Sequence, residues 1–297
     1  MLLCEACGLT FAHPMTVSEP PEKLFGEAYG NLLKGTQVED FADRLRLRPF
    51  LLRTLEHAPP SVCYKLALEH LEAHVARGST VFEIGVGTGA FLHLLRRRGY
   101  NAVGLDVAEP VVRLLKQEGF RVWHGTLQTL PESFVEPAFV CSFFVLHHLS
   151  DPIDFVQSIR RRFPSSPVVL AVADGKTIRR IHGGAIRHGR AKSKFHALPP
   201  RTPSWWTGKS VETLLTRAGY KAEVFIVTEQ PINVLPLQLS RRLAPVLNLP
   251  PVSFLYTLLF PAFQKLLGSL EKAFRLVSPK SFPSYHDILA VGIPDND

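Results

Sequence analysis

The sequence predicts an α/β fold in which a mostly parallel sheet of seven strands carries helices on both faces. Short apolar runs alternate with segments of helical pattern across residues 61–230. Several of these runs are apolar throughout, which is typical of strands that are covered on both faces. A glycine-rich turn follows the first run at residues 85–89, where a strand-to-helix connection can bind a ligand.

The expected elements follow one another in a regular order. The predicted strands cover residues 80–84, 102–106, 121–124, 139–144, 168–173, 222–228 and 287–293. The predicted helices cover residues 61–77, 90–98, 110–118, 152–163 and 211–218. We therefore expect three parts: an N-terminal helical cap (1–60), a ligand-binding domain (61–230 with 284–297) and an apolar helical insertion between strands six and seven (231–283).

The composition limits the class of protein. The chain has 297 residues, of which 46% are hydrophobic, so it can bury a full core and is not wholly disordered. Its formal net charge of +8 favours anionic partners. The first twenty residues lack the pattern of a secretory signal, so we expect a cytoplasmic protein with reduced thiols.

The insertion contains an uncharged stretch from Leu243 to Gln264 that is long enough to cross a bilayer. Four prolines interrupt it, and each of them removes a backbone donor. We therefore expect the segment 231–280 to act as a lid, a dimer surface or a patch that contacts a membrane from one side.

The glycine turn lies between two acidic residues. Gly85, Gly87 and Ala90 fit the relaxed dinucleotide-binding pattern, which alone leaves several phosphate and nucleotide ligands open. Glu83 ends the preceding strand, where a carboxylate would repel a pyrophosphate and attract a cation. Asp106 ends the second strand, where a carboxylate can accept hydrogen bonds from ribose hydroxyls.

Four motifs in order resemble the class I S-adenosylmethionine-dependent methyltransferases. They are Glu83–Gly89, Gly104–Val107, Gly125–Leu127 and Ser142–Pro152. The resemblance covers roughly residues 65–230 and implies a Rossmann-like fold with S-adenosyl-L-methionine as cofactor. Similar enzymes commonly have a glutamate where His147 stands, and many have an acidic residue where Thr126 stands.

The resemblance also implies a set of cofactor-binding residues. The methionine part would contact Glu83, Gly85, Val86, Gly87 and Gly89, the ribose Asp106 and Val107, the adenine Thr126 and Leu127, and the sulfonium side Phe143 and Phe144. Tyr29 lies in an aromatic segment that often caps the cofactor in similar enzymes. Ordinary packing is the alternative for Tyr29 and for both phenylalanines.

The methyl acceptor is expected at the carboxyl ends of strands four and five. His147 and His148 follow strand four and are the candidate general bases, unless they only support the start of a helix. A basic loop follows strand five, with no acidic residue between Asp174 and Glu212. Residues expected to bind an anionic acceptor or to form its pocket are Arg179, Arg180, Arg201, Trp205 and Trp206.

Cys4 and Cys7 resemble the second half of a zinc ribbon that precedes some of these methyltransferase domains. Structural zinc takes four ligands, so we expect no bound metal, with zinc shared across a dimer as the alternative.

These features predict a methyltransferase that acts on a small or lipid-linked, anionic acceptor at an oxygen, nitrogen or carbon atom. The protein is expected to be a monomer or a homodimer. A nucleic-acid methyltransferase is the main competing interpretation, but the sequence has no separate RNA-binding module and no Asn-Pro-Pro-Tyr motif. A non-catalytic S-adenosylmethionine-binding protein also stays open, and so does a nicotinamide-dependent dehydrogenase, although Glu83 argues against the dehydrogenase.

Overall fold

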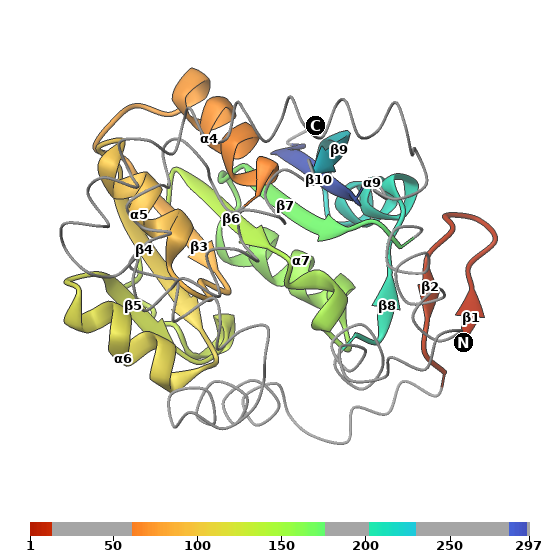
Figure 1. The fold of residues 1–297 in the computed structure, drawn as a ribbon, viewed down its shortest axis with the longest axis horizontal. Helices are drawn as coiled ribbons and strands as arrows, with labels where there is room; N and C mark the ends of the chain where they lie inside the picture. The colour runs from red at the N-terminus through yellow and green to blue at the C-terminus, as the bar shows by residue number, and fades with distance from the viewer. Residues whose placement is uncertain (14–60, 176–201, 230–284, 296–297) are drawn as a thin grey trace, which may run out of the picture.

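The structure is a computed structural model that describes residues 1–13, 61–175, 202–229 and 285–295 (Figure 1). Residues 14–60 of the predicted N-terminal cap (1–60) and the whole predicted insertion (231–283) lie outside the described residues. Among the described helices, none has the length and apolar character to cross a membrane.

The central sheet has seven strands in the order β5-β4-β3-β6-β7-β10-β9. Their bounds are β3 Thr80–Ile84, β4 Asn101–Asp106, β5 Arg121–His124, β6 Phe139–Phe143, β7 Val168–Ala173, β9 Tyr220–Glu229 and β10 Tyr285–Pro294. The pairs among β3, β4, β5, β6 and β7 are parallel, whereas β10 is antiparallel to both β7 and β9. The predicted, mostly parallel α/β sheet is therefore confirmed.

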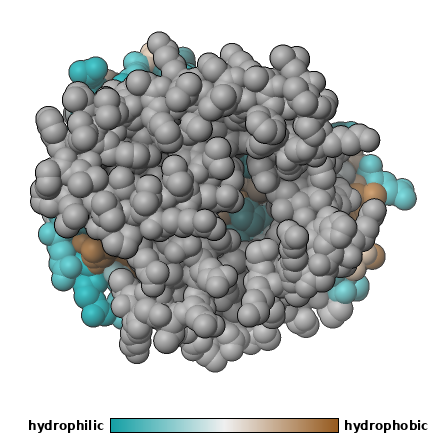
Figure 2. Space-filling model, viewed as in Figure 1, coloured by the Kyte–Doolittle hydropathy of each residue, from teal (hydrophilic) through white to brown (hydrophobic). Residues whose placement is uncertain are grey.

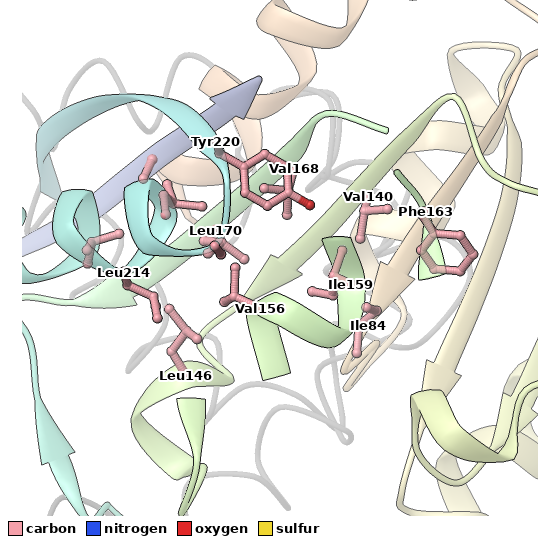
Figure 3. Close-up of a cluster of buried hydrophobic side chains, with 14 of the residues drawn as sticks. Ile84, Val140, Leu146, Val156, Ile159, Phe163, Val168, Leu170, Leu214 and Tyr220 are labelled. Atoms are coloured by element: carbon pink, nitrogen blue, oxygen red, sulfur yellow. The ribbon is translucent and has the colours of Figure 1, made fainter. Parts of the chain in front are cut away.

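Helices cover both faces of this sheet (Figure 1). The α-helices are α4 Val62–His74, α5 Ala90–Arg97, α6 Glu109–Gln117, α7 Pro152–Arg162 and α9 Gly208–Arg217. Along β3, Val81 packs with the α4 and α5 side chains, while Phe82 and Ile84 pack on the opposite face with those of α7 and α9. Figure 3 shows part of this second cluster, in which Val156 and Leu214 face the sheet from α7 and α9.

A second, smaller sheet joins the amino terminus to the segment that follows β7. It consists of β1 Leu2–Leu3, β2 Thr10–Phe11 and β8 Ser204–Trp205. Both of its strand pairs are antiparallel, and the backbone of Trp206 bridges to Asp174 just after β7. This places the hairpin of residues 1–13 on the side of the sheet where the acceptor is expected (Figure 1).

Candidate functional site

The glycine-rich turn connects β3 to α5 with a backbone that only glycine adopts easily. Gly85 has φ of 79° and Gly89 has φ of 75°. A Cβ atom on Gly85 would lie 2.3 Å from Cγ2 of Val145, so a side chain at this position has no room. The turn thus requires glycine at Gly85 because Val145 occupies the space, and it leads the chain into the start of α5.

Glu83 is buried beneath this turn, with a relative exposure of 1%. Its carboxylate accepts a backbone hydrogen bond from Leu92 in the first turn of α5, but Oε2 has no partner in the described part of the chain. Burial raises the pKa of Glu83 well above its ordinary value, and the charge of Asp106 raises it further. A buried, unpartnered carboxylate oxygen is costly unless a ligand satisfies it, and it fits the cationic methionine end of S-adenosylmethionine.

Asp106 closes the glycine turn from the neighbouring strand. Its Oδ2 accepts a hydrogen bond from the Gly87 N–H at 3.0 Å, and its Oδ1 accepts one from the Ala108 N–H at 2.8 Å. Burial raises the pKa of Asp106, and these two N–H groups act in the opposite direction. Each carboxylate oxygen accepts more than one hydrogen bond, so the arrangement leaves capacity for ribose hydroxyls.

The segment after β5 forms a short 3-10 turn over Leu127–Thr129, capped by Thr126. The Thr126 N–H donates to Oγ1 of Thr129 at 3.0 Å, and that hydroxyl donates back to the Thr126 carbonyl at 2.8 Å. Leu127 is buried in the core. The N–H and the carbonyl of Thr126 are therefore both engaged within this turn.

The two phenylalanines at the end of β6 differ in their surroundings. Phe143 is packed between Tyr64 and Phe91, with ring centroids at 4.7 Å and 4.6 Å. Phe144 has φ of 59°, which is rare for a bulky residue, and its N–H donates to the Ala171 carbonyl at 2.7 Å. Such strain is typical of functional sites. Neither this strain nor the hydrogen bond from Ser142 Oγ to the Ile84 carbonyl at 3.0 Å has a signal in the sequence.

His147 and His148 lie on a 3-10 turn over Leu146–His148, directly after β6. Their ring centroids are 4.0 Å apart. His147 is buried, and its Nδ1 has no partner among the described residues. Burial, together with the neighbouring His148, lowers the pKa of His147 well below its ordinary value. The imidazole of His147 is thus held neutral, which makes it a hydrogen-bonding group and a weak base.

Both candidate tryptophans are buried. The Trp206 indole N–H donates to Ser204 Oγ at 3.0 Å, and its ring packs in the core. Trp205 packs against Ala173 at the end of β7. These contacts are those of packing residues beside the expected acceptor site. Four of the predicted ligand-binding residues lie outside the described residues: Tyr29, Arg179, Arg180 and Arg201.

Among the described residues, Cys4 and Cys7 have no further ligands that would complete a zinc site. Cys63 and Cys141 are fully buried in α4 and β6, so they cannot join Cys4 and Cys7. No group of three or more metal-ligating side chains occurs in the part of the chain that the structure describes. Two thiols do not fit the four ligands that structural zinc requires.

Comparison with known proteins agrees with this geometry. A family model described as a methyltransferase domain matches residues 48–223. A search of curated proteins gave no match. A mycolic acid cyclopropane synthase crystallised with S-adenosylhomocysteine has a TM-score of 0.53 and 18% identity, covering 81% of this chain and 85% of that one. A cyclopropane synthase from Mycobacterium tuberculosis has a TM-score of 0.51 and 18% identity, covering 80% and 85%.

The family match covers more than half of the chain, and the fold is similar to that of a solved structure over 81% of the chain. The unpartnered oxygen of Glu83 and the position of Asp106 fit the cofactor that this family uses. The chain therefore belongs to the methyltransferase-domain family and is a class I, S-adenosyl-L-methionine-dependent methyltransferase.

Proposed function

We propose that this methyltransferase acts on a small or lipid-linked, anionic acceptor bound at the carboxyl ends of β6 and β7. When bound, S-adenosylmethionine supplies an electrophilic methyl group on a sulfonium. Transfer then requires alignment of the acceptor with this methyl group and the exclusion of water.

The main support for the proposed cofactor site is Oε2 of Glu83, which has no hydrogen-bond partner among the described residues. Glu83 would accept a hydrogen bond from the ammonium of the methionine part. Asp106 would accept hydrogen bonds from the ribose while it keeps its bonds to Gly87 and Ala108. The backbone from Gly85 to Gly89 would lie along the methionine part, because Gly85, Gly87 and Gly89 have no side chain.

The acceptor side combines neutral imidazole with basic side chains. Because His147 is held neutral, it would accept a hydrogen bond from the acceptor, and His148 would take up a proton where the acceptor carries one. The loop after Asp174 is rich in Lys and Arg, including Arg179 and Arg180, and would bind a phosphate or carboxylate group. The protein would be cytoplasmic, and the apolar segment 231–280 would allow contact with a membrane surface.

Two measurements test these assignments. Calorimetric titration with S-adenosylmethionine is expected to give binding by the wild type, with at least about tenfold weaker binding by Glu83→Gln. Glu69→Gln, an exposed substitution on α4 in an ion pair with Lys65, is the matched control and should bind normally. Wild-type affinity in Glu83→Gln would remove Glu83 from the cofactor site.

The acceptor is tested by transfer of labelled methyl groups to a metabolite extract, to lipid-linked anionic intermediates and to nucleic acid. Label in an anionic small molecule or lipid is the expected result, and label only in nucleic acid would overturn the proposal. His148→Ala should then lower turnover with the cofactor affinity unchanged. Full turnover by both His147→Ala and His148→Ala would show that neither histidine acts as a base.

A further inference from the structure

The N-terminal hairpin holds two thiols at one tight turn. Cys4 ends the β1 side of this turn, where its N–H donates to the Leu9 carbonyl at 2.8 Å. The Gly8 N–H donates to the Cys4 carbonyl at 2.8 Å, and Gly8 has φ of 76°, which lets the chain reverse direction. Cys4 and Cys7 are thereby held close enough for their side chains to hydrogen-bond to each other.

The two thiols have unequal surroundings. The sulfur of Cys4 accepts backbone hydrogen bonds from Cys7 and Ala6, and these bonds, with the side chain of Cys7, lower the pKa of Cys4. Cys7 is more buried, and burial is the main reason why its pKa is raised. The charge of Arg217 favours the thiolate at both positions. An accessible, stabilised thiolate next to a shielded thiol is the arrangement that supports thiol–disulfide exchange.

The hairpin lies at the margin of the molecule, on the right-hand side of Figure 1. In Figure 2, the same margin shows teal and brown surface, which belongs to described residues. Both cysteines are partly exposed, whereas Cys63 and Cys141 are fully buried. A small disulfide in solution can therefore reach only the hairpin pair while the protein remains folded.

We infer that Cys4 and Cys7 form a reversible disulfide by exchange with a small-molecule disulfide such as oxidised glutathione. The Cys4 thiolate attacks one glutathione sulfur, the glutathione disulfide bond breaks, and one glutathione leaves and takes up a proton. Cys7 loses its proton to solvent and attacks Cys4 Sγ, which releases the second glutathione. The two cysteines lose two electrons, and one glutathione disulfide gains them.

This pair is connected to the acceptor side of the enzyme. The carbonyl of Cys7 accepts a hydrogen bond at 2.9 Å from Oγ1 of Thr207, which caps α9. The Ala12 N–H donates to the Pro203 carbonyl at 2.7 Å, beside the strand that contains Trp205. Because Thr10 of the hairpin pairs with Trp205, we expect oxidation of the two thiols to alter the tryptophan fluorescence.

The test uses the full chain, freed of metal by EDTA and equilibrated with mixtures of reduced and oxidised glutathione. After an acid quench and maleimide blocking, peptide mass spectrometry should find a Cys4–Cys7 disulfide that grows with the oxidant, while Cys63 and Cys141 remain thiols. Cys7→Ser should accumulate glutathione on Cys4, because the resolving thiol is missing. In Cys4→Ser, Cys7 should acquire glutathione about tenfold more slowly than Cys4 does in Cys7→Ser, as expected for a thiol with a higher pKa.

Three results would overturn the inference. In the first, the wild type keeps both thiols reduced in oxidised glutathione alone. In the second, it stops at the mixed disulfide. In the third, the purified chain carries zinc that resists EDTA and blocks the reaction of both thiols. The wild-type titration decides the matter even if one serine variant fails to fold.

Discussion

The substitution Asp106→Asn tests whether this carboxylate holds the glycine turn. In the wild type, its oxygens accept N–H bonds from Gly87 at 3.0 Å and Ala108 at 2.8 Å. Asparagine has an NH2 group in place of one carboxylate oxygen. One of these two hydrogen bonds is therefore lost, and the NH2 group faces a backbone N–H. A hydrogen bond to a charged group contributes about 1.5–3 kcal/mol. Removal of the buried charge offsets part of this loss, because it relieves the desolvation of Asp106 and its repulsion with Glu83. We therefore expect a net loss of about 2 kcal/mol of stability.

Urea unfolding followed by tryptophan fluorescence measures this loss, and calorimetry should show cofactor binding weakened by at least about tenfold. Asp151→Asn is the matched control. Asp151 caps α7 by accepting a hydrogen bond from the Asp154 N–H at 2.9 Å, and asparagine caps a helix equally well. If Asp106→Asn unfolds at the wild-type midpoint and binds the cofactor normally, the carboxylate does not organise the turn.

Three further predictions concern the same site. Glu83 has a raised pKa in the folded protein, so the folded state binds an extra proton. The free enzyme should lose stability as pH rises from about 4.3. Glu83→Gln should reduce that loss in pH-dependent melting, and the raised pKa of Asp106 accounts for the remainder. Gly85→Ala should destabilise more than Gly119→Ala, because both glycines have positive φ but only Gly85 lacks room for a Cβ; equal unfolding midpoints would refute the steric reasoning. The turnover of His148→Ala should fall without a change in cofactor affinity, and a matching loss of affinity would indicate a structural role instead.

The central sheet could be predicted because its inner strands β3, β6 and β7 are buried on both faces. Such strands read as continuous apolar runs, as in Val168–Ala173, and every predicted strand has a counterpart in the structure. Strand ends were less predictable. β9 and β10 each extend beyond the expected 222–228 and 287–293, since backbone pairing between them continues past the apolar residues to Tyr220 and Pro294.

The candidate site was predictable where residue type alone defines the chemistry. The glycines and the two carboxylates follow from the sequence, but the hydrogen bond from Gly87 to Asp106 does not, because it depends on how two strands align. The strain at Phe144 is likewise a property of the folded backbone. The three-stranded sheet could not be predicted, because its strands have two residues each and β2 pairs with β8 almost two hundred residues later.

The position of β10 has a consequence for how the sheet forms. β10 lies between β7 and β9, yet it follows both of them in the chain. During synthesis, the edge of β7 therefore stays without its final partner until the carboxyl-terminal strand has left the ribosome. An unpaired, apolar strand edge promotes aggregation. Premature termination before residue 285 should thus yield insoluble chains, even though the complete glycine turn and both of its carboxylates have already been made.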